Sequence, residues 1–165
     1  MIRKASIDDI PLIHDLAEIA FRNTYKDILS PEQLEYMMDW MYSEESLAHQ
    51  MTVADHIFFI EDGKGYASFR FDGHTDDDRE LFHLEKLYVL PEYQKTGLGR
   101  RLFEKVLEEA ASAASGDSYR IELNVNRNNP AVGFYEHLGM HKDRQGDFAI
   151  GKGFFMNDYI MAIDF

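Results

Sequence analysis

The spacing of hydrophobic residues from about residue 10 to residue 51 is that of three short helices. Asp8 or Asp9 can cap a helix that begins near Ile10-Pro11, because proline is tolerated in a first helical turn. Ser30-Pro31 gives the same start signal for a second helix, and a third helix is expected from Ser43 to Met51. The buried faces of the first two helices are expected to contain Leu12, Leu16, Ile19, Ala20, Leu34, Met37, Met38 and Met41.

From residue 57 onwards, the pattern changes to short apolar runs separated by turns, which is typical of strands. Residues 57–60 and 66–71 predict a hairpin, residues 81–90 a long strand, and residues 98–113 an amphipathic helix. The other expected elements are strands over 2–7, 119–125, 144–151 and 154–164, a polar loop over 72–78 and a helix over 130–138. About seven strands with one central β-α-β crossover predict an α/β fold, in a single domain over residues 1–165.

Composition narrows the classes of function. The chain has no cysteine, which excludes disulfides, Cys-ligated zinc and thiolate catalysis. A net charge of -13 argues against nucleic acid as a partner. Solubility is the simpler explanation of the charge, and attraction of a cationic substrate is the alternative. No apolar run is long enough for a membrane span, and the early acidic residues do not fit a signal peptide, so a cytoplasmic protein is expected. His74 with its neighbouring Asp residues could hold a metal, but a solvated turn is the simpler interpretation and no metal is expected.

The most informative segment runs from an expected strand through a glycine-containing loop into an expected helix. A helix N-terminus offers unpaired backbone N–H groups and partial positive charge, which together bind phosphate. Gly97 and Gly99 allow close backbone approach, and Lys95, Arg100 and Arg101 add positive charge. The segment has no Gly-Lys-Ser/Thr and no third glycine at Rossmann spacing, which excludes those two phosphate loops.

Two motifs in this order resemble those of the GNAT-type N-acetyltransferases. The loop Gln94-x-x-Gly97-x-Gly99 is similar to the family's pyrophosphate-binding motif. The segment from Asn128 to Met140 is similar to its Asn-x-x-Ala-x-x-Phe-Tyr-x-x-x-Gly-Phe motif, with Met140 where an aromatic residue is usual. The resemblance implies the GNAT fold: a mixed, mostly antiparallel sheet of about seven strands, splayed at a central parallel pair and flanked by helices.

The resemblance also implies where acetyl-CoA, the co-substrate, would bind. The pantetheine arm would pair with the backbone of the strand ending at residue 89, and the loop would hold the pyrophosphate, while Asn128 would contact the pantetheine side. The expected cofactor-binding residues are Leu87, Tyr88, Val89, Gln94, Lys95, Thr96, Gly97, Leu98, Gly99, Arg100, Asn128 and Tyr135.

Acetyl transfer to an amine needs a base and an acid. An alkyl amine has a pKa of about 10.4, so a carboxylate that removes its proton, directly or through water, would help at neutral pH. Glu85 is the expected base, because strand alternation puts it on one face with His83, Leu87 and Val89, and His83 or a bound water is the alternative. Tyr135 is the expected acid for the leaving thiolate, and without a cysteine or a Ser–His–Asp set, direct transfer is favoured over an acyl-enzyme.

The acceptor is less clearly indicated. Residues 21–27, 30–33 and 154–162 resemble the corresponding parts of PaiA-type polyamine N-acetyltransferases, which implies spermidine or spermine. Another amine, such as a peptide N-terminus, a lysine or an aminoglycoside, is the first alternative. A non-catalytic acyl-CoA-binding regulatory module is the second, and the joint presence of Glu85 and Tyr135 argues against it. The sequence leaves the oligomeric state open, a homodimer included.

Overall fold

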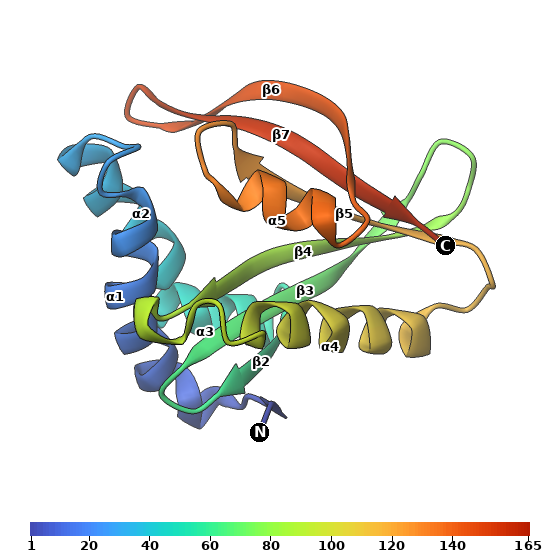
Figure 1. Ribbon diagram of the computed structural model, residues 1–165, viewed down its shortest axis with the longest axis horizontal. Coiled ribbons are helices and arrows are strands. Elements are labelled where there is room, and N and C mark those ends of the chain that lie inside the picture. Colours follow the sequence, from blue (N-terminus) through green and yellow to red (C-terminus); the bar gives the residue numbers. More distant parts are fainter. The chain divides into compact units, whose positions relative to one another are not determined.

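The computed structural model describes residues 1–165, which form two compact units. Unit 1 consists of Met1–Arg70 and Glu85–Ser112, and unit 2 consists of Phe71–Leu84 and Ala113–Phe165. One seven-stranded sheet has the strand order β1-β2-β3-β4-β5-β7-β6 (Figure 1). The single domain over residues 1–165 therefore stays a prediction.

The sheet is mixed, as predicted. Its strands are β1 (Arg3–Lys4), β2 (Ile57–Glu61), β3 (Gly65–His74), β4 (Glu80–Val89), β5 (Tyr119–Asn126), β6 (His141–Gly151) and β7 (Phe154–Asp164). β4 and β5 are parallel, with Glu80 opposite Tyr119 and Leu84 opposite Leu123. β2 pairs antiparallel with β1 and β3, and β7 pairs antiparallel with β5 and β6. The expected crossover between parallel strands is made by the helix that follows β4.

Unit 1 contains four α-helices that begin where the sequence signals predict. They are α1 (Ile10–Tyr25), α2 (Pro31–Tyr42), α3 (Glu44–Thr52) and α4 (Leu98–Ala113). The hydroxyl of Ser30 accepts a hydrogen bond from the N–H of Gln33, and that of Ser43 accepts one from Ser46, each at 3.1 Å. No helix combines the length and the apolar character that crossing a bilayer requires.

The buried face of α1 differs from the predicted one. Ile19 is 53% exposed, although the predicted stripe included it. The observed stripe is rotated and contains Ile10, Ile13, Leu16, Ala17, Ala20, Phe21 and Tyr25. These positions also follow the 3.6-residue period of a helix. The aromatic side chains of Phe21 and Tyr25 bury more surface than Ile19 would, so packing favours this face of α1.

The first strand is also shorter than predicted. β1 covers Arg3–Lys4 only, and Ile7–Asp9 forms a 3-10 turn that leads into α1. The carboxylate of Asp9 accepts a hydrogen bond from the Ser6 N–H at 2.8 Å and pairs with Arg3. These local bonds compete with extended backbone and end the strand early.

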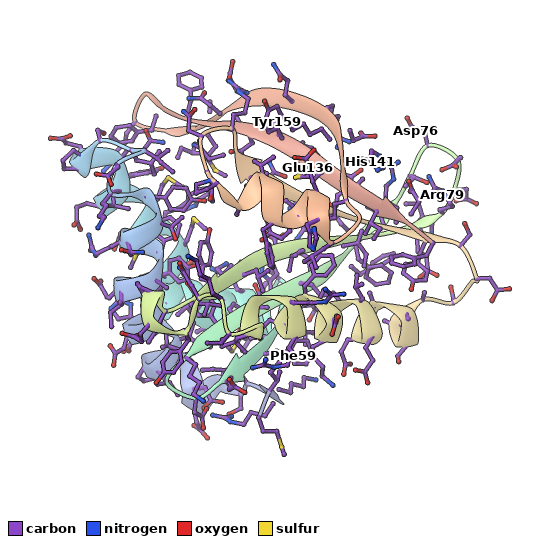
Figure 2. The ribbon with its side chains drawn as sticks, in the orientation of Figure 1. Phe59, Asp76, Arg79, Glu136, His141 and Tyr159 are labelled. Atoms are coloured by element: carbon purple, nitrogen blue, oxygen red, sulfur yellow. The ribbon has the colours of Figure 1, made fainter.

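Two layers of helix cover the sheet within unit 1. Adjacent residues of a strand point to opposite faces, so Phe58 and Phe59 of β2 mark the two sides. The ammonium of Lys105 in α4 lies 5.6 Å from the ring centroid of Phe59, and Figure 2 labels Phe59. On the other side, Phe58 faces Lys86, whose ammonium bonds Gln50 of α3.

Unit 2 is held at one end by a network of ion pairs. Arg79, which is labelled in Figure 2, pairs with Asp77 and with Asp164 of β7. Arg120 of β5 also pairs with Asp164 at 2.7 Å, and these two guanidinium groups lower the pKa of Asp164 to about 2. Residues 72–74 extend β3, so the predicted loop begins only at residue 75. No group of three or more His, Asp or Glu side chains is arranged to hold a metal ion, and the expected absence of a metal stays a prediction.

Candidate functional site

The loop between β4 and α4 has the backbone shape of an anion site. After the 3-10 turn Pro91–Tyr93, Lys95 has φ of 66° and Gly97 has φ of 85°. A Cβ added to Gly97 would meet only Arg101 Nη1, at 3.4 Å, so the left-handed backbone rather than crowding is what favours glycine there.

The backbone N–H groups from Lys95 to Arg100 have no acceptor within the chain. The first intrahelical bond of α4 is the one from Arg101 N–H to the Gly97 carbonyl, at 3.0 Å. A run of unpaired donors at a helix N-terminus is the arrangement that binds phosphate oxygens. The residues present therefore fit the pyrophosphate that the sequence motif predicts.

Internal bonds hold the loop in this shape. The hydroxyl of Thr96 donates to the Tyr93 carbonyl at 2.5 Å, and Arg101 donates to the Thr96 carbonyl at 3.3 Å. Arg100, one of the predicted cations, pairs with Glu104 at 2.9 Å. Lys95 forms no ion pair and is exposed, so it is the cation of the loop that is available to an anionic ligand. Gln94 bonds the Val89 carbonyl at 3.4 Å.

The end of β4 lies against a glycine that the sequence analysis did not single out. A Cβ on Gly65 would be 2.8 Å from the Tyr88 carbonyl oxygen, so only glycine permits this approach of β3. The ring of Tyr88 contacts Phe21, Tyr25 and Tyr66, with centroid distances of 5.6, 6.4 and 5.7 Å. Its side chain therefore belongs to an aromatic cluster, and its backbone is the part suited to the predicted cofactor role.

Glu85, the expected base, is half-buried and paired. Arg70 Nε of β3 donates to Glu85 Oε1 at 2.6 Å, and both side chains belong to unit 1. A charge-assisted bond of this length fixes the orientation of the carboxylate and neutralises its charge. The sequence analysis did not identify Arg70 as the partner of Glu85. Pairing between neighbouring strands depends on the strand register, which the amino-acid sequence alone does not give.

The contacts between β3 and β4 do not fit strict alternation in both strands. Arg70 and Gly65 are five residues apart on β3, whereas Glu85 and Val89 are four residues apart on β4. Glu85 bonds Arg70, and Val89 Cγ2 lies 3.3 Å from a Cβ added to Gly65. One of the two strands therefore departs from regular alternation between these contacts, and the common face of Glu85 and Val89 stays a prediction.

Lys86 is the most unusual side chain next to this segment. It is 4% exposed, and its ammonium donates to Gln50 Oε1 at 2.7 Å between the rings of Tyr42 and Phe58. Burial lowers the pKa of Lys86 to about 8, against a partial opposing effect of Glu85. A lysine in a strand is normally expected to be solvated, so the sequence analysis did not predict that Lys86 is buried.

In unit 2, Asn128 lies just before α5 (Ala131–His137) and Tyr135 lies within it. The side-chain oxygen of Asn126 accepts from the Asn128 N–H at 2.8 Å, and that of Asn129 accepts from Ala131 at 2.9 Å. The Asn128 side chain is exposed and bonds nothing in the chain, which suits a ligand contact. Tyr135 is 7% exposed, with its ring 5.3 Å from that of Phe134.

His83, the alternative base, lies in unit 2. Its Nδ1 is 3.9 Å from Asp72 Oδ2, and its registered neighbour on β5 is Glu122. Glu85 and the loop belong to unit 1, whereas His83, Asn128 and Tyr135 belong to unit 2. The catalytic and cofactor roles of these residues stay predictions.

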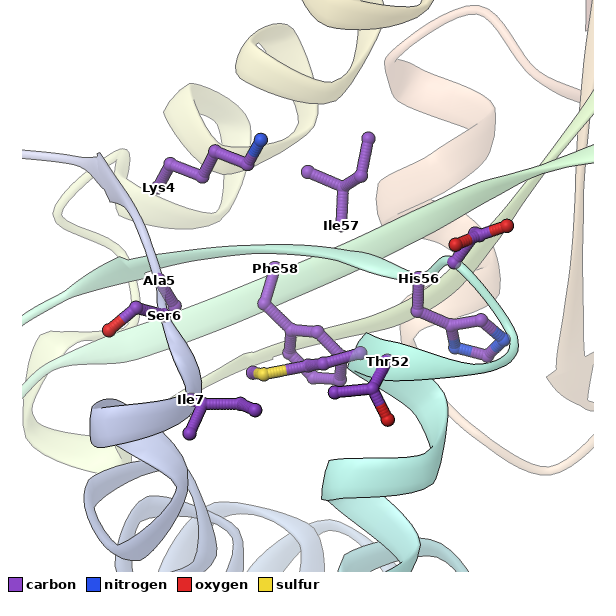
Figure 3. A pocket seen from close by; sticks show the side chains of 10 residues that line it. Lys4, Ala5, Ser6, Ile7, Thr52, His56, Ile57 and Phe58 are labelled. Atoms are coloured by element: carbon purple, nitrogen blue, oxygen red, sulfur yellow. The ribbon is translucent and has the colours of Figure 1, made fainter.

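A separate pocket of about 390 Å³ lies at the N-terminal edge of unit 1 (Figure 3). Lys4, Ile7, His56 and Phe58 are among its lining residues. None of the predicted site residues lines it, so it is distinct from the candidate site.

Comparison with known proteins decides the family. The model of the acetyltransferase (GNAT) family matches residues 12–140. The chain belongs to the GNAT acetyltransferase family. An uncharacterized N-acetyltransferase of Mycobacterium tuberculosis is 33% identical over 139 residues, which cover 81% of this chain and 83% of the relative. Another from Lactobacillus delbrueckii subsp. lactis is 24% identical over 167 residues, covering 92% and 95%. The chain is accordingly a GNAT N-acetyltransferase.

Solved structures agree on the fold. The PaiA N-acetyltransferase from Thermoplasma acidophilum, in complex with coenzyme A, has a TM-score of 0.72 at 24% identity and covers 100% of this chain and 98% of its own. The ribosomal-protein-S18-alanine N-acetyltransferase from Escherichia coli has a TM-score of 0.67 at 20% identity and covers 99% and 92%. The predicted GNAT fold is thus confirmed.

Proposed function

We propose that this GNAT protein transfers the acetyl group of acetyl-CoA directly to a primary amine of a cationic acceptor. The observation that carries the proposal is the run of backbone N–H groups without acceptors from Lys95 to Arg100, at the N-terminus of α4. The coenzyme A in the Thermoplasma acidophilum PaiA complex, a protein of the same fold, supports it.

The cofactor residues of the proposal come from both units. In unit 1, the loop Gln94–Arg100 would hold the pyrophosphate, with Lys95 as its free cation, and the backbone of Leu87 to Val89 would pair with the pantetheine arm. In unit 2, the exposed amide of Asn128 would contact the cofactor as well. A splay of β4 from β5 beyond their registered pairs is part of the same proposal.

Acetyl-CoA supplies the activated thioester, and the protein supplies proton transfer. Glu85 would receive the proton of the amine, directly or through water, with Arg70 as the residue that orients it at 2.6 Å. Tyr135 would donate its phenolic proton to the departing thiolate. The acidic net charge of -13 and the PaiA-like segments favour a polyamine as acceptor. The cytoplasmic location stays a prediction.

The change Glu85→Gln keeps the shape of the side chain and removes the base. We expect a lower rate at neutral pH that partly recovers as the pH rises, because the neutral amine, with a pKa of about 10.4, becomes abundant without help. The measurement is kcat with one amine at saturating acetyl-CoA, over a pH series from about 6.5 to 9.5, below the amine pKa.

The control is Glu80→Gln, which removes a carboxylate from the other end of the same strand, where it accepts hydrogen bonds from Ser115. Its profile should follow that of the wild type. Profiles of equal height for Glu85→Gln and wild type would remove Glu85 from the mechanism. A uniformly lower but parallel profile would assign Glu85 to substrate binding and leave His83 or a water as the base.

A further inference from the structure

Asp158 of β7 is a buried carboxylate in unit 2, which also contains the predicted site residues Asn128 and Tyr135. It is 2% exposed and lies opposite Asn126, the last residue of β5. Asn128 and the helix that carries Tyr135 follow directly after this point in the chain. Asp158 also lies outside the residues 12–140 that the family model matches.

The carboxylate of Asp158 has a single protein partner. Its Oδ2 accepts a hydrogen bond from the amide of Asn124 at 3.2 Å, and its Oδ1 accepts none. Oδ1 is not among the side-chain atoms that are both fully sealed from solvent and unpartnered. It therefore keeps a small exposed area, through which a ligand would have to reach it.

No cation of the chain bonds this carboxylate. The nearby Arg127 donates to the backbone carbonyls of Asp158 and Gly146, at 3.3 and 3.1 Å, and its other nitrogen pairs with Asp147 at 2.7 Å. Burial raises the pKa of Asp158, while the bond from Asn124 and the charge of Arg127 oppose the rise. Burying a carboxylate with so little compensation is costly.

Glu122 of β5 is a buried carboxylate of unit 2 whose charge is compensated by arginine side chains. It is 6% exposed, similar to Asp158, but Arg144 and Arg120 bond its two oxygens at 3.0 and 3.2 Å. A buried carboxylate of unit 2 can therefore be compensated by cations, and Asp158 differs from Glu122 in lacking a bonded cation. A charged group kept in an unfavourable environment beside candidate site residues is typical of ligand binding.

We infer that Asp158 binds an ammonium group of the acceptor, and that the acceptor is an amine with at least two such groups. The inference rests on the proposed function. An ammonium brings both the missing positive charge and N–H donors for Oδ1, which no neutral or anionic ligand does. The amine that attacks the thioester must be neutral, whereas a carboxylate partner stabilises the protonated form. The group at Asp158 is therefore a second ammonium, and a polycationic amine satisfies both requirements.

The test compares spermidine with butylamine, which reproduces one arm of spermidine without the additional charges. Both are titrated by calorimetry into CoA-loaded protein, and kcat and KM are measured with acetyl-CoA. In Asp158→Asn we expect at least about tenfold weaker binding and higher KM for spermidine, with kcat changed by less than about threefold and little change for butylamine. Because the change removes a buried charge, the melting temperature should stay equal or rise.

The matched control is Asp147→Asn, which removes an exposed carboxylate that pairs with the same Arg127. It should behave like the wild type within about twofold, since an exposed pair contributes little. The inference is overturned if Asp158→Asn binds spermidine normally, loses kcat alone or unfolds at a much lower temperature. It is also overturned if the wild type does not prefer spermidine. Loss of the proposed function itself would appear separately, as failure of wild-type protein to bind acetyl-CoA.

Discussion

Replacing Gly97 by Asp should abolish useful binding of acetyl-CoA while the protein stays folded. The backbone at Gly97 has φ of 85°, and the N–H groups that follow it have no acceptor in the chain. An Asp side chain here would put negative charge where the cofactor's pyrophosphate is proposed to lie. We expect a loss of affinity of roughly 100-fold or more, equivalent to about 2.7 kcal/mol, measured by titration calorimetry.

Gly63→Asp is the matched control for this change. Gly63 also has a left-handed backbone, with φ of 73°, and a Cβ there would meet nothing within 4 Å. Both variants should therefore lose about 1 kcal/mol of stability or somewhat more through backbone strain. Only Gly97→Asp should lose the cofactor. Equal affinity in the two variants would show that the cofactor does not lie against this loop.

Tyr135→Phe should slow turnover by roughly 10- to 10³-fold and leave acetyl-CoA binding nearly unchanged. The phenol is proposed to protonate the leaving thiolate, and Phe keeps the ring that contacts Phe134. The loss should appear equally in kcat and kcat/KM, because the interaction is made only in the transition state. Steady-state kinetics with one amine, together with calorimetry for acetyl-CoA, measure both quantities.

The control is Tyr119→Phe. Tyr119 is 8% exposed in the same unit, close to the 7% of Tyr135, and its ring stacks on Phe165. Removing its hydroxyl should leave turnover within about twofold of the wild type, since it has no place in the proposed chemistry. An unchanged rate in Tyr135→Phe, under conditions where chemistry limits turnover, would return Tyr135 to a role in packing.

Local signals in the sequence predicted most of the fold. Ser30 caps α2 as expected, because a cap requires only the residues that follow it. The parallel pair β4–β5 was predictable from the helix between the strands, since parallel neighbours need a crossover. The rotation of α1 that exposes Ile19 was not predictable from the sequence, because two faces of that helix are apolar and tertiary packing determines which one is buried.

The candidate site was predicted less completely, for a related physical reason. The loop Gln94–Arg100 is contiguous, so its glycines and the helix after it could be read together. The pairing of Glu85 with Arg70, the burial of Lys86 and the lack of compensation at Asp158 all depend on contacts between residues distant in the chain. Such contacts become visible only when the strand register and the burial of each side chain are known.

The central claim is catalytic acetyl transfer to an amine, and one measurement tests it most directly. The protein is incubated with acetyl-CoA and each of a panel of amines: spermidine, spermine, lysine, a peptide with a free N-terminus and an aminoglycoside. Free thiol is followed together with the mass of the amine product. We predict N-acetylation of at least one amine, with release of an equal amount of thiol. Tight binding of acetyl-CoA without acetylation of any amine would contradict the claim and identify an acyl-CoA-binding module.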